Sequence, residues 1–411
     1  MQKRKLIVVI FSMVFSVTAA WAQDATTQSE IDELKQRIEE LEKKQTDSEA
    51  TVGEIRQQLP SPGLEIAKKV AIGGVLSGVY QYESVSGPPD IDDRGRGAIS
   101  FQPEISITPT EHSEIFFALG FAAGNGLAGV TSFNLAPWAA GVEDDVKNIN
   151  GRGRDYLLQA WYGHTFEFGD DHNAFITGGI IDGTDYLDDN AYANDEYTQF
   201  MNEALVNGPN TFIPSWDIGG AGRYSIGDFS ITGVYMNIGE NDAGNNFNFF
   251  GGQLAYNLKS SLGEGNYRAL VNGSSEAFPN PEGTSLENRV TLGISFDQEL
   301  GENFGAWIRW YWQDDAALVN YTAIYSGGVF VSGNLWGREQ DHIGIGYAYL
   351  DGAEQTEDSL KNTHVGEAYV SFGLHEYLAL TFDVQYMKDS YVLSENDVDG
   401  WIAGVRATCE F

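Results

Sequence analysis

Arginine, acidic and aromatic side chains share one face of several segments in which two kinds of residue alternate. In residues 304–313, Trp307, Arg309 and Tyr311 occupy every second position, and the positions between them are apolar. Guanidinium and carboxylate groups form paired hydrogen bonds with hydroxyl groups, and a flat aromatic ring covers the apolar C–H face of a pyranose. This combination favours a surface that contacts sugars.

Further residues of these chemical types fall on the same face of other alternating segments. The set predicted to line a water-filled wall comprises Trp161, Arg223, Arg268, Arg289, Trp307, Arg309, Tyr311, Glu367, Asp383 and Arg406. A structural interpretation stays open for each arginine, because arginines inside a barrel also pair with Asp or Glu to compensate their charge.

An acidic segment at residues 183–214 is the second candidate site. Its apolar residues recur at helical spacing: Tyr197, Phe200, Met201, Ala204 and Leu205. Asn194 precedes them as a candidate N-cap, and Gly208 with Pro209 ends the pattern. We expect a helix that packs inside a barrel and constricts it. Its polar residues would face the lumen: Asp188, Asp189, Asn194, Asp195, Glu196 and Glu203. The alternative is a solvated loop whose acids have no role.

Paired acids also raise the question of hydrolysis or metal binding. Asp188 with Asp189 and Asp314 with Asp315 are pairs that a glycosidase could use, but neighbouring acids are common in a chain with 59 Asp and Glu residues. No nucleophile elbow accompanies them and their spacing fits no EF-hand, so we expect no enzyme, no metal and no cofactor. The formal net charge of −35 argues against nucleic-acid binding, which depends on bases that neutralise phosphates.

The elements that position these residues are predicted to be β-strands, because apolar and polar residues alternate with a period of two from residue 68 onward. Sixteen candidate strands are separated by turns that alternate in length. Short polar turns are expected at residues 110–112, 169–172, 227–228, 301–303 and 374–376, and long loops at about 83–96, 122–154 and 183–214. A soluble sandwich also alternates, but this order of turns is typical of outer-membrane barrels. We therefore predict an all-β fold, a 16-stranded antiparallel transmembrane β-barrel.

The last eleven residues, WIAGVRATCEF, show which face meets lipid. Every second residue back from the end is apolar: Phe411, Cys409, Ala407, Val405, Ala403 and Trp401. Arg406 and Thr408 lie on the opposite face, because successive side chains of a strand point to opposite sides. We expect the apolar set to face lipid and Phe411 to lie in the aromatic girdle at the membrane interface.

The N-terminal part differs from the rest of the chain. Residues 1–22 combine a basic start, an apolar run and an A-x-A site, which indicates a secretory signal peptide; a membrane anchor is the alternative, but the run is short for one. Residues 23–59 are predicted to form a periplasmic coiled-coil helix, followed by a linker at 60–67 and the barrel at 68–411. The heptad seam contains Ile31, Leu34, Ile38, Leu41, Gln45, Ser48, Val52, Ile55 and Leu59. It predicts self-association without fixing the copy number.

Several stretches resemble the OprB-type carbohydrate-selective porins of bacterial outer membranes. The most specific is WGREQDHIGIGYAY at 336–349, and DDNAYANDEYTQFMNEALVN at 188–207 is similar to the family's loop with a short Phe-bearing helix. TFDVQYM and DGWIAGVRATCEF match its last two strands. These stretches span most of residues 155–411. One departure is Ile180 in FITGGIID, where the family pattern has a lysine.

The resemblance implies a sixteen-stranded pore that passes sugars by diffusion. It also implies a Gram-negative outer-membrane location among phospholipid and lipopolysaccharide, and a terminal Phe that the barrel-assembly machinery recognises. By analogy with other porins, a homotrimer is expected. A general or ion- or carboxylate-preferring porin, a structural protein tethered through its coiled coil, and a soluble sugar-binding protein remain as alternatives.

Overall fold

The computed structural model describes residue 43 and residues 69–88, 92–141, 143–169 and 171–411. The predicted signal peptide, nearly all of the coiled-coil segment and the linker lie outside these residues. In the described part, no helix is long and apolar enough to cross a membrane.

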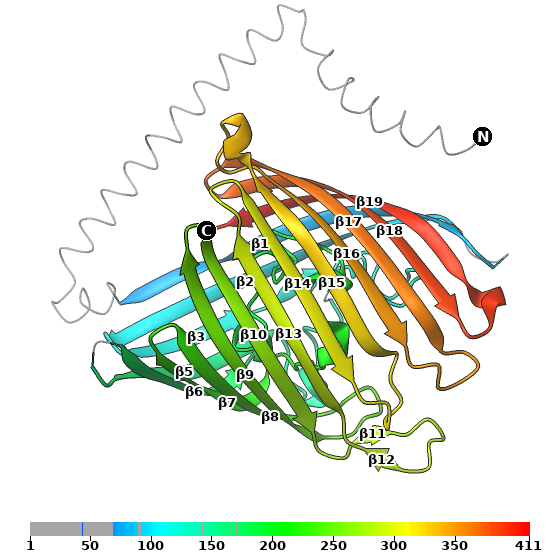
Figure 1. The fold of residues 1–411 in the computed structure, drawn as a ribbon, viewed down its shortest axis with the longest axis horizontal. Helices are drawn as coiled ribbons and strands as arrows, with labels where there is room; N and C mark the ends of the chain where they lie inside the picture. The colour runs from blue at the N-terminus through cyan, green and yellow to red at the C-terminus, as the bar shows by residue number, and fades with distance from the viewer. Residues whose placement is uncertain (1–42, 44–68, 89–91, 142, 170) are drawn as a thin grey trace, which may run out of the picture. The chain divides into compact units, whose positions relative to one another are not determined.

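One large antiparallel sheet closes on itself to form a barrel (Figure 1). Its strands are β1 (Val70–Ser86), β2 (Arg94–Thr110), β3 (Ser113–Leu119), β4 (Phe121–Ala123), β5 (Leu157–Glu167), β6 (His172–Ile181), β7 (Asp217–Ile226), β8 (Phe229–Ile238), β9 (Phe247–Ser260), β10 (Gly263–Ser274), β13 (Val290–Glu299), β14 (Phe304–Gln313), β15 (Tyr321–Ser332), β16 (His342–Gly352), β17 (Leu360–His375), β18 (Leu378–Tyr391) and β19 (Val398–Glu410). β3 and β4 both pair with β2 and form one interrupted crossing. The described residues thus give the sixteen antiparallel strands that the sequence predicts, with β19 paired to β1.

Turn lengths alternate as expected. Short turns join β2 to β3, β5 to β6, β7 to β8, β9 to β10 and β17 to β18, and the long connections lie at the other end. The long connection between β4 and β5, residues 124–156, is called L2, and the one between β6 and β7, residues 182–216, is called L3. The connection between β1 and β2 covers only residues 87–93, which is shorter than predicted, because both strands extend into that region. A two-stranded hairpin, β11 (Phe278–Pro279) and β12 (Leu286–Glu287), lies in another long connection.

The predicted register holds in the strands that carry the site. In β14, Trp307, Arg309 and Tyr311 face inward and are buried, while Ile308 and Trp310 are exposed on the outer face. The same holds for β19, where Arg406 and Thr408 are buried and Trp401 is exposed. Phe411 exchanges two backbone hydrogen bonds of 3.1 Å with Gly74 of β1, and its ring stays exposed on the barrel's outer side.

The prediction of a helix that starts at Asn194 is wrong. L3 contains only one α-helical turn, α4 (Glu203–Val206), and its N-cap is Asn202, whose side chain accepts from the Ala204 N–H at 3.0 Å. Two short 3₁₀ turns, η2 (Gly183–Asp185) and η3 (Pro209–Thr211), flank it. Between them the backbone of L3 bonds to side chains of the barrel wall, and these bonds replace those of a continuous helix.

Candidate functional site

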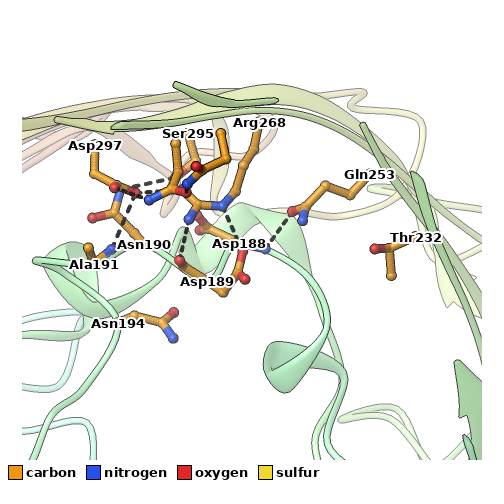
Figure 2. A network of polar contacts seen from close by, with 12 residues as sticks. Asp188, Asp189, Asn190, Ala191, Asn194, Thr232, Gln253, Arg268, Ser295 and Asp297 are labelled. Atoms are coloured by element: carbon orange, nitrogen blue, oxygen red, sulfur yellow. Dashed lines mark hydrogen bonds and ion pairs between the residues drawn. The ribbon is translucent and has the colours of Figure 1, made fainter. Parts of the chain in front are cut away.

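The first half of L3 is fixed to the wall by a network of charged groups, most of which are buried (Figure 2). Arg268 of β10 lies 2.6 Å from Asp189 and, through its other side, 2.6 Å from Asp297 of β13. Arg309 of β14 lies 2.9 Å from Asp188, with neither side chain exposed. A buried arginine needs such a partner, because an unpaired charge in this environment is costly. The structural interpretation therefore applies to Arg268 and Arg309.

Backbone groups of L3 complete the same network. The Asp188 N–H donates to Gln253 at 2.9 Å, and the Ala191 N–H donates to Asp297 at 3.3 Å. The Asn190 side chain donates to Ser295 at 3.2 Å. Figure 2 shows these contacts meeting around Arg268, with Asn194 apart from the dashed lines. Loop and wall are thus joined by polar groups that are mostly shielded from solvent, with Asp189 as the exception at 42% exposed.

The second half of L3 is held by another part of the wall, formed by β17 and β19. The Glu367 carboxylate of β17 accepts from the N–H groups of Met201 (2.6 Å) and Asn202 (2.9 Å). Arg406 of β19 donates to the carbonyl oxygens of Glu196 (2.7 Å) and Gln199 (3.0 Å). Glu367 and Arg406 were predicted as permeant contacts. In the structure their side chains instead form hydrogen bonds to the backbone of L3 and hold the loop in place.

L2 also lies inside the barrel, which the sequence analysis missed. The Pro137 carbonyl accepts from Gln81 (2.9 Å) and Gln385 (2.8 Å), and Trp138 is almost fully buried. Ala136 and Glu203 exchange two hydrogen bonds of 3.0 and 3.1 Å, which join L2 to L3. The available signal was the set of large apolar residues within a polar loop: Leu127, Phe133, Leu135 and Trp138.

Burial changes the electrostatics of this joint. The carboxyl group of Glu203 is taken out of water between L2 and L3, and this desolvation raises its pKa. The hydrogen bond from the Ala136 N–H acts in the opposite direction, since it stabilises the carboxylate. Desolvation is the larger of the two effects.

The predicted sugar track on β14 requires a correction. Phe200 of L3 packs edge-on against Trp307 with a centroid distance of 5.7 Å, and against Tyr369 at 5.2 Å. Trp307 is 2% exposed and Tyr311 is not exposed at all. These side chains face inward as predicted, but L3 covers them, so they do not line open lumen in this structure.

Several inward side chains of β2 to β7 stay partly exposed. Trp161 is half-buried there, stacks on Phe116 of β3 at 5.1 Å and meets Phe175 of β6 edge-on at 6.4 Å. We call Phe116, Trp161 and Phe175 the aromatic patch. Among the predicted aromatic residues, Trp161 is the one that keeps an accessible ring. Phe116 and Phe175 were missed because single aromatic residues in alternating strands carry no distinguishing signal.

Charged side chains border the aromatic patch. Asp185 of L3 and Glu104 of β2 are exposed, and Asp185 accepts from Gln159, whose oxygen accepts from the Trp161 ring N–H; both distances are 2.9 Å. Arg223 of β7 keeps 34% of its side chain exposed and lies 3.8 Å from Asp189. Acidic groups thus outnumber accessible basic groups beside the patch.

The remaining predicted residues have local roles. Asp195 accepts from the Tyr197 N–H at 2.7 Å and closes a turn, and Asn194 accepts from Asn207 at 2.8 Å. Asp383 is buried and accepts from Gln385 at 2.9 Å. Arg289, just before β13, lies over the rings of Phe212 and Phe278, with its guanidinium carbon 4.7 and 5.2 Å from the ring centroids.

Within the described residues, no group of three or more His, Cys, Asp or Glu side chains is placed to hold a metal ion.

Comparisons with known proteins agree with this architecture. The model of the OprB family, described as carbohydrate-selective porins, matches residues 131–411. The high-pH structure of Pseudomonas putida OprB is similar with a TM-score of 0.67 and 14% identity, over 85% of this chain and 96% of that one. The outer membrane channel DcaP of Acinetobacter baumannii gives a TM-score of 0.53 and 9% identity, over 83% and 97%.

A relative in sequence is also found. An uncharacterized protein of Aquifex aeolicus (strain VF5) is 32% identical over 265 residues, which is 64% of this chain and 74% of the relative. The match supports common descent. It adds no activity of its own.

Proposed function

The chain belongs to the OprB family of carbohydrate-selective porins, and from this premise we propose that sugars diffuse through its barrel between L3 and the wall formed by β2 to β7. Porins are channels, so the chain is an outer-membrane pore and not an enzyme. The observation that carries the proposal is the aromatic patch, where a ring is accessible beside hydrogen-bonding side chains. Covalent chemistry has no part in such a passage.

The geometry suits a transient contact with a pyranose. The accessible face of Trp161 covers an apolar C–H face, while Gln159 and Asp185 lie within reach of hydroxyl groups at its edge. Contacts of this kind must stay weak, because a channel site has to release what it admits. The buried Trp307, Arg309 and Tyr311 act indirectly, by holding L3 at its place.

Single-channel recordings in planar bilayers test this proposal. We expect maltose or glucose to block the wild-type current, and Trp161→Ala to weaken the block about two- to tenfold, the size of an aromatic contact of about 0.5–1.5 kcal/mol. Tyr162→Ala is the matched control, because this neighbour on β5 faces lipid and is half exposed. Equal block in wild type and in the Trp161→Ala variant would reject the patch as a sugar contact.

A cation-preferring general porin is the second candidate. It is favoured by the exposed Asp185 and Glu104 and by the neutralisation of Arg268 and Arg309 in ion pairs. In this case sugars would leave the current unchanged at any concentration that does not alter viscosity, while the reversal potential would show cation preference. The same recordings therefore separate the two functions.

Assembly is a further part of the proposal. The heptad pattern of residues 24–59, nearly all of which lies outside the described part, would associate copies of the chain, by analogy as a homotrimer. Deleting these residues should reduce the yield of cross-linked oligomer while each barrel stays folded. An unchanged oligomer yield would indicate that the segment is a tether.

The exposed ring of Phe411 would be the group that the assembly machinery recognises, so Phe411→Ala should lower the amount of barrel in the outer membrane.

A further inference from the structure

A polar cavity lies between L3 and the short-turn end of β7 to β10. Its volume is about 220 Å³, and it reaches the turn at Gly227 between β7 and β8. The polar groups around it include Asp189, Arg223, Gln253, Asn257, Asn266 and Arg268. A molecule that passes L3 from the long-loop end would enter this cavity next.

Several of these groups have bonding capacity left. Arg223 donates through Nε to Thr232 at 3.1 Å, and among the described residues its two terminal nitrogens form no hydrogen bond. Gln253 is only 3% exposed and uses its oxygen for the Asp188 N–H, which leaves its NH₂ group without a partner in the described part. Asn257 donates to Asn266 at 2.8 Å, and its own oxygen is left to accept.

The NH₂ group of Gln253 borders the cavity and can donate when a ligand or water supplies an acceptor. Here donors from Arg223 and Gln253 and an acceptor from Asn257 line one cavity. Hydroxyl groups both donate and accept, and a polyhydroxylated ligand satisfies this mixed set better than an anion, which only accepts.

The charges of the cavity support the same ligand class. Arg268 is already compensated by Asp189 and Asp297, both at 2.6 Å. Arg223 also faces Asp189, at 3.8 Å. Asp228 also lines the cavity. With Asp189 and Asp297 it makes three acids against two bases, so the cavity offers no net positive charge that would hold a carboxylate or phosphate.

The cavity adjoins the aromatic patch. Phe175 of the patch is the direct strand partner of Arg223 across β6 and β7. A sugar ring that leaves the patch towards the short-turn end therefore needs to move past only one strand. Two adjacent weak sites of this kind shorten each step that a permeant takes.

We infer that this cavity is an exit-side subsite for one neutral sugar ring, with Arg223, Gln253 and Asn257 as its contacts. The inference rests on the proposed sugar passage and adds to it a second site with its own residues. The site would act on release into the periplasm, because the short turns and the chain ends mark that end of an outer-membrane barrel.

The test measures the dwell time of maltose in single channels, with sugar on one side at a time. Asn257→Ala and Arg223→Gln should shorten the dwell time about three- to tenfold for sugar added at the short-turn side, the effect of losing one or two hydrogen bonds. The change should be smaller for sugar added at the long-loop side. Thr165→Ala, an inward residue of β5 outside the cavity, is the matched control and should behave as wild type.

Each outcome has one meaning. If Trp161→Ala weakens block while the Asn257 and Arg223 variants keep wild-type dwell times, the subsite is rejected and the sugar passage stands. If no sugar blocks the wild-type channel, the proposed function itself is rejected. Stronger block by gluconate than by glucose at equal concentration would overturn the assignment to a neutral ligand.

Discussion

Arg309 and Asp188 form an ion pair with an Nε–Oδ2 distance of 2.9 Å, and neither side chain is exposed to the lumen. Arg309 also donates to the backbone carbonyls of Leu205 and Ala193, so one side chain of β14 holds three points of L3. Removing one partner of a buried pair leaves an uncompensated charge, at a cost of about 3–5 kcal/mol. We therefore expect Arg309→Met to release L3, with higher open-channel conductance and more current noise.

The control is the double variant Asp188→Asn with Arg309→Met, which removes both charges. Replacing a buried ion pair by uncharged groups is often close to neutral, so thermal unfolding of the double variant should be nearer to wild type than that of the single variant. A single variant with wild-type conductance and wild-type unfolding temperature would show that the pair does not hold the loop.

Trp307→Ala tests the corrected role of β14. Because Trp307 packs under Phe200, its loss should leave a cavity and cost about 3–5 kcal/mol. Sugar block should then change only together with open-channel conductance, since the ring itself is out of reach of the permeant. Trp310→Ala, on the lipid face of the same strand, should leave conductance unchanged. Altered sugar block at wild-type conductance in the Trp307 variant would restore the direct contact.

Side-chain direction could be predicted from sequence because it depends only on neighbouring residues. A period of two assigns Arg309 to the inner face and Ile308 to the outer face, and a slip of one residue would reverse both. The number of strands and the alternation of turns follow from the same local signals. For this reason the prediction of the barrel is correct in its main features.

The covering of that inner face could not be predicted, because it depends on pairs that are distant in the chain. Asp188 and Arg309 are 121 positions apart, and Pro137 lies 248 positions from Gln385. Periodicity carries no information about such contacts. It also misled in L3, where the apolar residues at helical spacing belong to two different clusters. Phe200 packs with Tyr369 of β17, and Tyr197 packs with residues of β1 and β2.

Ion selectivity follows from which charges stay accessible. Arg268, Arg309 and Arg406 are buried, so they add little to the field in the open lumen, while Asp185 and Glu104 face it. Like-signed groups at a narrow passage concentrate counter-ions. Desolvation raises the pKa of Asp185 to about 7, so we expect cation preference in the reversal potential that is strongest above this pH. Asp185→Asn with Glu104→Gln should reduce it, and high salt should weaken it by screening.

Clear anion preference in wild type would contradict this account of the buried arginines. Glu376→Gln is a suitable control, because this exposed residue lies in the turn after β17, outside the constriction. It removes one charge without changing the passage beside L3.

The joint between L2 and L3 should depend on pH through Glu203. Burial raises the pKa of this carboxyl group above its ordinary value, so the folded barrel binds the proton more tightly than the unfolded chain does. Ionised Glu203 thus opposes folding: stability is highest below the ordinary pKa of glutamate and decreases as pH rises through the raised pKa.

Thermal unfolding in detergent, followed from about pH 4 to about pH 8, tests this. The unfolding temperature should decrease less with rising pH for Glu203→Gln than for wild type. Glu376→Gln should keep the wild-type dependence. If Glu203→Gln also keeps it, this carboxyl group is not the one that couples the two loops to pH.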